Sequence, residues 1–387
     1  MKILYDCQAF TQRVGGISRY FYELINHFED DPGLKWELPV RYSNNEYLRR
    51  LKQLNSRTGN TFGRGRWRLR HLKNRLLHGR SRRWVNKESA IARIRTGEYD
   101  IFHPTCHDDY FLEFLPRNKP FVLTVYDMIS EIYPECFPLD DPTSNRKKIL
   151  AQKAARIIAI SETTKRDLVN IFGIPEDKVT VIYLGNSLDA DAKPTDFNLL
   201  KDLPAQYLLF VGSRTGYKNF YFFLRSISAL LLENPELQIV CAGNSFTNEE
   251  NQFFESLGLT GRIKQYAVGD IGLAYCYQNA RAFVFPSLYE GFGLPALEAF
   301  SCGCPAILST GGSLPEIGAD AAIYFNPKDG RAIQEAVSRA INDEGLRREL
   351  IQKGKTRVRD FSWEKTARTT KQVYTEVLTH LNPRGNT

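Results

Sequence analysis

The amino-acid sequence predicts an α/β protein built from two doubly wound domains. Short strand-like runs alternate with longer helical patterns from one end of the chain to the other, which is the pattern of parallel sheets covered by helices. Several strand-like runs are apolar almost throughout, as expected for strands buried on both faces of a sheet. The alternation stops once, over residues 186–205, and then begins again with a new strand. We therefore expect two Rossmann-like domains that face each other across a ligand-binding cleft.

The expected elements follow in chain order. In the first half, β-branched and aromatic runs predict strands at residues 2–6, 100–104, 121–127, 156–161 and 179–183. In the second half, similar runs predict strands at residues 207–212, 237–243, 263–267, 282–287, 305–310 and 321–325. Helical patterns fill residues 17–29, 162–173 and 217–235.

The domain organisation follows from the polar break and from the end of the chain. Residues 186–205 are polar and contain Pro and Asp, which is typical of an interdomain linker. The last helical pattern, from residue 363, is not followed by a strand. The sequence thus predicts an N-terminal domain over 1–190, a C-terminal domain over 200–362, and a helix over 363–387 that packs back on the first domain.

Composition excludes several classes. The 387 residues are 42% hydrophobic and 25% charged, and no apolar run reaches the roughly 18 residues of a transmembrane helix. The start "MKILYD" reads as a strand and not as a signal peptide. Seven cysteines without a CxxC pair fit reduced thiols in a cytoplasm. Cys302 and Cys304 have no second Cys/His pair at suitable spacing, so no metal site is predicted.

The positive charge is concentrated in one segment. Residues 41–95 contain 17 Lys and Arg and two acids, a net charge of +15, whereas the whole chain carries +8 and the rest therefore about −7. Within that segment, Leu69, Leu72 and Leu76 fall at helical spacing among basic residues and tryptophans. A basic amphipathic helix of this kind can lie on an anionic bilayer. The candidate membrane-binding residues are Arg66, Trp67, Arg68, Arg70, Lys73 and Arg75.

Two other interpretations of the basic segment stay open. It could be a helix that packs on the first sheet and keeps a solvated basic face. Nucleic-acid binding is also conceivable for so basic a stretch, but no nucleic-acid-binding motif accompanies the charge.

Two glycine-containing loops are candidate phosphate sites. Gly15 and Gly16 follow the first strand and immediately precede a helix, whose free N–H groups can bind an anion. The spacing is not GxGxxG, so a dinucleotide site is poorly supported, and a simple turn remains the alternative. In "VGSRTGYKN", Gly212 ends the first strand of the second half, and Arg214 and Lys218 follow. The planar guanidinium of Arg214 and the compact charge of Lys218 suit a diphosphate. In the alternative interpretation, both residues are solvated cations of a loop.

A pair of carboxylates flanks a third loop. Glu290 lies before, and Glu298 about one turn inside, a helix that Pro295 should begin. Gly291 and Gly293 lie between them and expose their amides. A hydrolytic pair must flank the scissile bond, which two residues from one loop and its helix seldom achieve. A clamp for sugar hydroxyls beside phosphate-binding amides fits the spacing better.

The motifs together resemble those of retaining glycosyltransferase family 4, in particular bacterial surface-polysaccharide mannosyltransferases. "EGFGLPALE" resembles the E-x7-E motif of that family, and "VGSRTGYKN" its VGR…KN signature. The stretches "VGGISRY", "HPT", "IIAISETTKRDL" and "FSWEKTA" match the same family in order. The resemblance implies the GT-B fold, an N-terminal acceptor domain, a C-terminal donor domain, and activity without a metal or other cofactor.

The resemblance also implies roles for the site residues. Arg214 and Lys218 would neutralise the leaving phosphate, and Glu290 would hold hydroxyls of the transferred sugar. Glu298 would hold the nucleotide ribose. The remaining donor-binding residues would be Gly15, Gly16, Gly212, Gly291, Phe292, Gly293 and Leu294.

One position departs from the family pattern. The family usually has a His-Asp pair after the strand at 121–127, whereas this chain has Tyr126 and Asp127. The tyrosine hydroxyl could replace the hydrogen bond of the family histidine, and Asp127 is either a catalytic group on the acceptor side or a loop cap. His103 and His107 are candidate acceptor-side groups, with a structural histidine as the alternative for each.

These features predict a retaining hexosyltransferase that works on the cytoplasmic face of the membrane. Its donor would be a GDP- or UDP-linked sugar, with mannose from GDP-mannose as the first choice, and its acceptor a lipid-linked or polysaccharide saccharide. Two alternatives remain. One is a nucleotide-sugar epimerase of the same fold, for which the extra acid/base groups are missing. The other is a non-catalytic sugar-nucleotide or lipid-binding protein.

Overall fold

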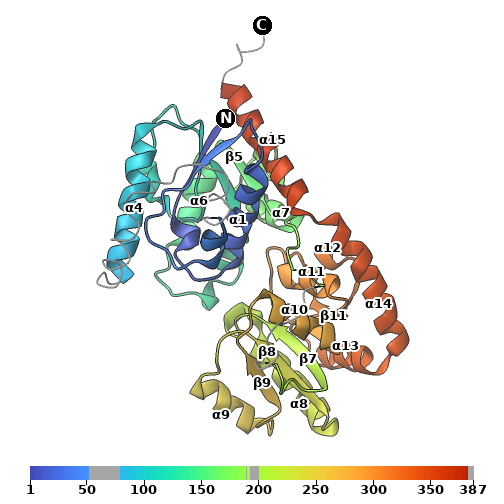
Figure 1. Ribbon diagram of the computed structural model, residues 1–387. Coiled ribbons are helices and arrows are strands. Elements are labelled where there is room, and N and C mark those ends of the chain that lie inside the picture. The colour runs from blue at the N-terminus through green and yellow to red at the C-terminus, as the bar shows by residue number, and fades with distance from the viewer. Residues whose placement is uncertain (52–78, 189, 192–199, 382–387) are drawn as a thin grey trace.

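The computed structural model describes residues 1–51, 79–188, 190–191 and 200–381. Figure 1 shows two lobes, an N-terminal one in blue to green and a C-terminal one in yellow-green to red, joined by two crossings of the chain. The long last helix leaves the second lobe and runs along the first (Figure 1). The predicted α/β class with two Rossmann-like domains is confirmed.

The N-terminal domain contains parallel strands in the order β2-β1-β3 and β4-β5-β6. A parallel bridge between Phe102 and Phe121 connects β3 to β4, so the two halves continue one sheet. Its strands are β1 (Lys2–Tyr5), β2 (Lys35–Glu37), β3 (Ile101–His103), β4 (Val122–Val125), β5 (Arg156–Ala159) and β6 (Val179–Val181). Its helices include α1 (Gly16–Phe28), α4 (Gly79–Thr96), α5 (Ile129–Ile132), α6 (Thr143–Lys153) and α7 (Glu162–Phe172).

The C-terminal domain has a six-stranded parallel sheet in the order β12-β11-β10-β7-β8-β9. Its strands are β7 (Gln206–Val211), β8 (Leu237–Ala242), β9 (Ile263–Tyr266), β10 (Ala282–Phe285), β11 (Ala306–Ser309) and β12 (Ala322–Phe325). Its helices are α8 (Phe220–Glu233), α9 (Asn248–Ser256), α10 (Asp270–Asn279), α11 (Leu294–Ser301), α12 (Leu314–Gly318), α13 (Gly330–Asn342) and α14 (Glu344–Arg357). The strand order reverses between β7 and β10, which is the switch point of a doubly wound sheet.

The sequence patterns account for most of these elements. Each run predicted as a strand coincides with a strand of the structure to within a few residues, as expected for short apolar β-branched and aromatic runs that are buried on both faces of a parallel sheet. The sequence does not predict strand β2, because this strand has only three residues and lies partly exposed at the edge of the sheet. The helix expected from residue 217 begins later, at Phe220, after a 3-10 turn over Gly216–Lys218 and Asn219 in the left-handed region at φ 59°.

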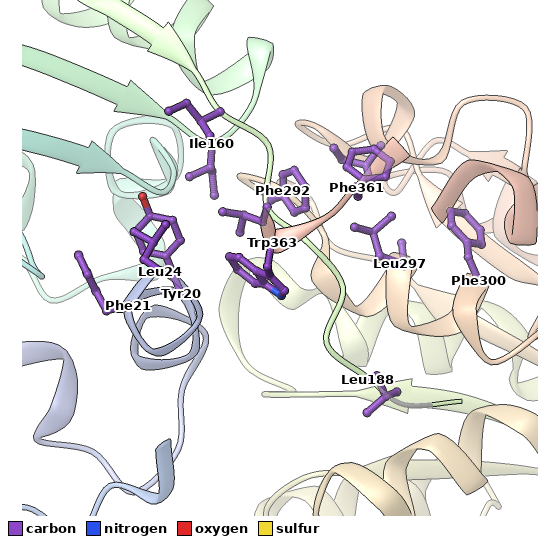
Figure 2. Close-up of a cluster of buried hydrophobic side chains, with 14 of the residues drawn as sticks. Tyr20, Phe21, Leu24, Ile160, Leu188, Phe292, Leu297, Phe300, Phe361 and Trp363 are labelled. Carbon is purple, nitrogen blue, oxygen red and sulfur yellow. The ribbon is translucent and has the colours of Figure 1, made fainter. Parts of the chain in front are cut away.

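The two domains share a hydrophobic core where the chain crosses between them. Gly185 lies on one crossing and Trp363 on the other. The two residues are so close that a Cβ atom added at Gly185 would be 2.3 Å from the backbone nitrogen of Trp363. Figure 2 shows Trp363 lying between Tyr20 of the N-terminal domain and Phe292 and Leu297 of the C-terminal domain. The two crossings therefore pack together as one connection.

The last helix, α15 (Trp363–Leu381), packs on the N-terminal domain, as predicted. It lies against α1, and its Tyr374 hydroxyl is 2.6 Å from Nδ1 of His103 and 3.3 Å from the Tyr5 hydroxyl. The N-terminal lobe is thus assembled from both ends of the chain.

The candidate membrane residues Arg66, Trp67, Arg68, Arg70, Lys73 and Arg75 lie outside the described residues. Among the described helices, none combines the length and apolarity that crossing a bilayer requires.

Candidate active site

The central charged pair of the site lies at the switch point of the C-terminal sheet. Lys218 follows β7 and Glu290 follows β10, the two adjacent strands between which the order reverses. The Nζ atom of Lys218 is 2.6 Å from Oε1 of Glu290. The sequence placed these residues 72 positions apart, and the fold brings them into contact at the carboxyl ends of the strands.

Lys218 is enclosed by aromatic rings. Its Nζ atom lies 5.0 Å from the ring centre of Tyr217 and 5.2 Å from that of Phe285. Burial disfavours the charged amine, but attraction to Glu290 and to other nearby groups outweighs it and holds the pKa of Lys218 above its usual value. Lys218 is therefore a fixed positive charge at neutral pH.

The Glu290 loop is held by the loop between β11 and α12. The Ser313 hydroxyl donates to the carbonyl oxygens of Glu290 and Phe292, at 3.0 and 2.8 Å. Gly312 adopts φ 64°, and a Cβ atom there would be 2.3 Å from the Glu290 carbonyl oxygen. This support was missed from the sequence, although a glycine pair directly after the strand at 305–310 was a signal of close backbone approach.

Glu298, on α11, is already paired across the domains. Its Oε1 atom is 2.6 Å from Nη1 of Arg19 on α1, and its Oε2 atom is 3.3 Å from the Tyr277 hydroxyl. Both side chains of the ion pair are largely buried, with 13% of Arg19 and 6% of Glu298 exposed. The sequence offered Arg19 only as one letter of "VGGISRY" and gave no sign of this contact.

Arg214 lies in the same domain but is engaged elsewhere. Its Nε and Nη2 atoms donate to the two carboxylate oxygens of Glu250 at 2.6 and 3.1 Å, and Nη2 also donates to the Ser245 carbonyl. Its guanidinium stacks over the ring of Phe246. The Nε and Nη2 atoms of Arg214 are thus turned toward α9, and the structure does not bring Arg214 into the contact between Lys218 and Glu290.

Gly16 and Gly212, in the two candidate phosphate-binding loops, leave the backbone open to the close approach of a ligand. Gly16 is the first residue of α1, and a Cβ atom there would meet no other described atom within 4 Å. The same holds for Gly212, which ends β7 with φ 110°. Gly15 caps α1 without a side-chain hydrogen bond.

The segment after Glu290 meets the N-terminal domain. A Cβ atom at Gly291 would lie 1.9 Å from the Tyr126 carbonyl oxygen and 2.8 Å from Cβ of Asp127. The Gly291 carbonyl accepts a hydrogen bond of 2.7 Å from the Ser161 hydroxyl. The Glu290 loop and the Tyr126-Asp127 loop are therefore in van der Waals contact across the cleft.

The next three residues turn the chain into α11. Phe292 is buried, Gly293 adopts φ 109°, and Leu294 begins the helix with Pro295 behind it. A left-handed residue at this position favours glycine, because other side chains are strained there.

A second contact locks the same two domains. Glu316 of α12 accepts hydrogen bonds from the backbone nitrogens of Glu162 and Thr163, at 2.7 and 3.0 Å. These are free N–H groups at the start of α7, so a carboxylate of one domain caps a helix of the other.

Asp127 lies over a buried ionic network. Its carboxylate caps the Ile129 nitrogen at 3.0 Å, as the loop-cap interpretation anticipated. Below it, the buried Lys147 donates to the Asp127 carbonyl oxygen at 3.0 Å and to Glu131 at 2.8 Å. The negative charge of Asp127 also contributes to the raised pKa of Lys218, so the two domains are electrostatically coupled at this point.

Tyr126 points into the N-terminal domain. Its hydroxyl donates to the Thr105 carbonyl oxygen at 3.2 Å, and its ring lies 5.6 Å from that of His107. Burial raises its pKa well above the usual value, so it is a neutral hydrogen-bonding group.

The two candidate histidines are both neutral. His107 is half-buried and its Nε2–H group donates to the Thr124 carbonyl at 3.0 Å, and burial with the nearby Lys147 charge lowers its pKa to about 4. His103 is completely buried, with Tyr374 and Thr124 at its two ring nitrogens, and burial lowers its pKa to about 3. His103 is therefore a structural histidine of the core, and an acceptor substrate cannot reach it.

The depressed pKa of His103 predicts a pH-dependent stability. The folded protein keeps His103 neutral down to about pH 3, whereas the unfolded chain binds a proton near pH 6.5. The unfolded state therefore binds more protons between these values, and the contribution of His103 to stability, fully present above pH 6.5, falls by about 1.4 kcal/mol per pH unit as the pH drops. We expect urea unfolding at pH 7, 6 and 5 to show that the wild type loses about 2 kcal/mol of unfolding free energy relative to His103→Gln as the pH falls from 7 to 5. A difference that stays constant with pH would contradict this account.

Within the part of the chain that the structure describes, no group of three or more His, Cys, Asp or Glu side chains is arranged to hold a metal ion.

The fold and the site define the class of the protein, which is the GT-B glycosyltransferases. Two models of glycosyltransferase domains match consecutive parts of the chain, Glycosyltransferase Family 4 over residues 14–190 and Glycosyl transferases group 1 over residues 191–357. The two matches together cover residues 14–357, so the chain is a glycosyltransferase whose N-terminal half matches glycosyltransferase family 4.

The chain is similar to proteins that are named as mannosyltransferases. It is 27% identical to the O-antigen chain mannosyltransferase B of Escherichia coli, over 97% of this chain and 99% of that protein. It is 29% identical to the serotype-specific mannosyltransferase WbdA of Escherichia coli, over 80% of this chain and 40% of that protein. Among solved structures, Anabaena Alr3699/HepE in complex with UDP-glucose superimposes with a TM-score of 0.70 at 17% identity, over 98% of this chain and all of that one.

Proposed function

We propose that the protein transfers mannose from GDP-mannose, with retention of anomeric configuration and without a metal, to a saccharide carried on a lipid at the cytoplasmic face of the membrane. The acceptor belongs to the assembly of a surface polysaccharide. Relatives over most of the chain are named as O-antigen mannosyltransferases, which supports both the sugar and the acceptor class.

The observation that carries the proposal is the contact between Lys218 and Glu290 at the switch point. A nucleotide sugar at this point places its diphosphate beside the Lys218 amine and its sugar ring beside the Glu290 carboxylate. The helix α1 begins at Gly16 and reaches the C-terminal domain through Arg19 and Glu298, and the N–H groups of a helix start can bind an anion.

These groups suit the chemistry of donor cleavage. The bond between the anomeric carbon and the diphosphate oxygen breaks, and the electron pair leaves with the phosphate, where Lys218 and the α1 amides stabilise the growing charge. The acceptor hydroxyl oxygen forms the new bond from the same face of the sugar, and its proton passes to the departing phosphate. Glu290 holds sugar hydroxyls as positive charge develops on the ring.

The closed contact between the two domains supports a transferase over a hydrolase. Gly291 and the Tyr126-Asp127 loop touch, and the Glu316 carboxylate caps α7 across the same boundary. The side chains of Lys218 and Glu290 are only 17% and 11% exposed, and a site sheltered from water favours passage of the sugar to a bound acceptor over passage to solvent.

The membrane part of the proposal draws on the charge of the N-terminal domain. The helix α4 continues the basic segment and exposes 64% of Trp84, and an aromatic ring beside basic residues is typical of membrane interfaces.

The function is tested with GDP-mannose, UDP-glucose and dTDP-glucose, each labelled in the sugar, and a synthetic mannoside on a lipid diphosphate in anionic vesicles. We expect transfer from GDP-mannose only when the acceptor is present, an α-configured product by NMR, and no loss of rate in EDTA. In parallel, replacing Arg66, Arg68, Arg70 and Arg75 by Ser should weaken sedimentation with the vesicles at low salt.

Each alternative has its own outcome. Conversion of the donor without acceptor would indicate an epimerase, and binding without turnover a non-catalytic protein. An inverted product would overturn the retaining mechanism, and unchanged sedimentation of the serine variant would overturn the membrane role of the segment.

A further inference from the structure

The Arg19 side chain joins the two domains through hydrogen bonds to the C-terminal domain. Its Nη1 atom binds Glu298 at 2.6 Å and its Nη2 atom binds Asp270 at 3.1 Å, both in the C-terminal domain. Its Nε atom donates to the Tyr47 hydroxyl at 2.8 Å, which fixes the guanidinium from its own domain. The attraction of Glu298, Tyr47 and Asp270 outweighs burial and raises the pKa of Arg19 above its usual value.

A second arginine provides a contrast. Arg50 also reaches from the N-terminal domain to Asp270, at 3.3 Å, but its side chain is 49% exposed, and within the described part of the chain it bonds Asp270 and not Glu298. The two arginines therefore share the role of bridging the domains, and only Arg19 touches the carboxylate that we assign to the donor.

Glu298 is fixed without being saturated. Arg19 occupies Oε1 and the Tyr277 hydroxyl occupies Oε2, whereas an ionised carboxylate offers about four acceptor positions. One position on each oxygen thus remains for two hydroxyl donors, and a vicinal diol such as that of ribose presents donors at this separation. Held from both sides, the carboxylate cannot rotate away when the nucleotide arrives.

We propose that Arg19 sets the ribose specificity of the donor site by holding Glu298 in position from across the cleft. The inference rests on the proposed function, since it takes Glu298 to be the ribose-binding carboxylate. Arg19 is a positioning residue in this account. It lies three residues after Gly16 on the same helix, so α1 meets the nucleotide at the diphosphate with its N-terminus and at the ribose through Arg19 and Glu298.

The specificity is measured as a ratio of two dissociation constants. Calorimetry with GDP and 2′-deoxy-GDP, and with UDP and 2′-deoxy-UDP, is carried out on the wild type and on the variants Arg19→Gln, Arg19→Lys, Arg50→Gln and Glu298→Gln. For the base that binds, we expect the wild type to prefer the ribonucleotide by about 10-fold or more, the usual effect of a hydrogen bond to a charged group. The preference should fall to about 3-fold or less in Arg19→Gln, be partly restored in Arg19→Lys, and stay at the wild-type value in Arg50→Gln.

The outcomes separate the inference from the function beneath it. If Glu298→Gln keeps the full preference, the ribose assignment of Glu298 fails, and the Arg19 proposal with it. If Glu298→Gln loses the preference but Arg19→Gln keeps it, only the role of Arg19 fails. A merely structural Arg19 would weaken ribo- and deoxyribonucleotide equally and leave the ratio unchanged, so a partly unfolded variant cannot imitate the expected result.

Discussion

Replacing Glu290 by Gln should lower kcat by about 10²- to 10³-fold while the affinity for GDP changes by less than about threefold. The amide keeps the size of the side chain but removes the negative charge that we assign to the transferred sugar, and Lys218 loses its charged partner at 2.6 Å. Nucleotide contacts elsewhere are unaffected, because the Glu290 backbone is held by Ser313 and not by its own side chain. Single-turnover transfer and calorimetry with GDP measure the two quantities.

The control is Glu335→Gln, on the exposed face of α13, which should behave as the wild type. Unchanged turnover of Glu290→Gln would remove the residue from the catalytic site. A parallel loss of GDP affinity would instead assign the carboxylate to the nucleotide.

Replacing Gly291 by Ala should lower kcat by about 10²-fold or more by separating the domains. The new methyl group would lie 1.9 Å from the Tyr126 carbonyl oxygen, and backbone on both sides leaves no flexible side chain to yield. We expect a larger radius of gyration in solution scattering, and a weaker affinity for GDP because Arg19 and the start of α1 would move away from the donor site that we propose. Displacing reacting groups by about 1 Å can already cost 100-fold in rate.

The matched variant is Gly269→Ala, since a Cβ atom at Gly269 would meet no other described atom within 4 Å. It should keep both the wild-type activity and the wild-type radius. Full activity of Gly291→Ala at an unchanged radius would mean that contact between these two loops is dispensable for transfer.

The sequence predicts the elements of this fold better than their contacts. Apolar runs and glycine turns are local signals, and they place β1 and β7, the start of α11, and the loops that contain Lys218 and Glu290. The ion pair of Arg19 with Glu298 joins residues 279 positions apart, and no local pattern encodes such a contact. The contact between Glu316 and the start of α7 could not be predicted for the same reason.

Arg214 illustrates a different limit. Its spacing from Lys218 suggested a shared crevice, but a capping box at the start of α9 places Glu250 where it can take the guanidinium. Whether Arg214 binds a carboxylate of its own domain or a ligand phosphate depends on where Glu250 lies in the fold. Composition and spacing could not decide between these two partners. Tyr126 is a similar case, because the direction of its hydroxyl depends on the Thr105 carbonyl of a neighbouring strand end.

The return of α15 to the first lobe has a consequence for the order of synthesis. A ribosome completes residues 1–185 long before residues 363–381, yet Tyr374 supplies the hydroxyl that satisfies the buried His103 and covers the apolar side of α1. Until α15 is made, the N-terminal lobe exposes the surface of α1 that α15 covers, whereas the second lobe is formed by a continuous stretch of chain. Nascent chains that stop short of α15 should accordingly depend on chaperones, whereas the released protein should not.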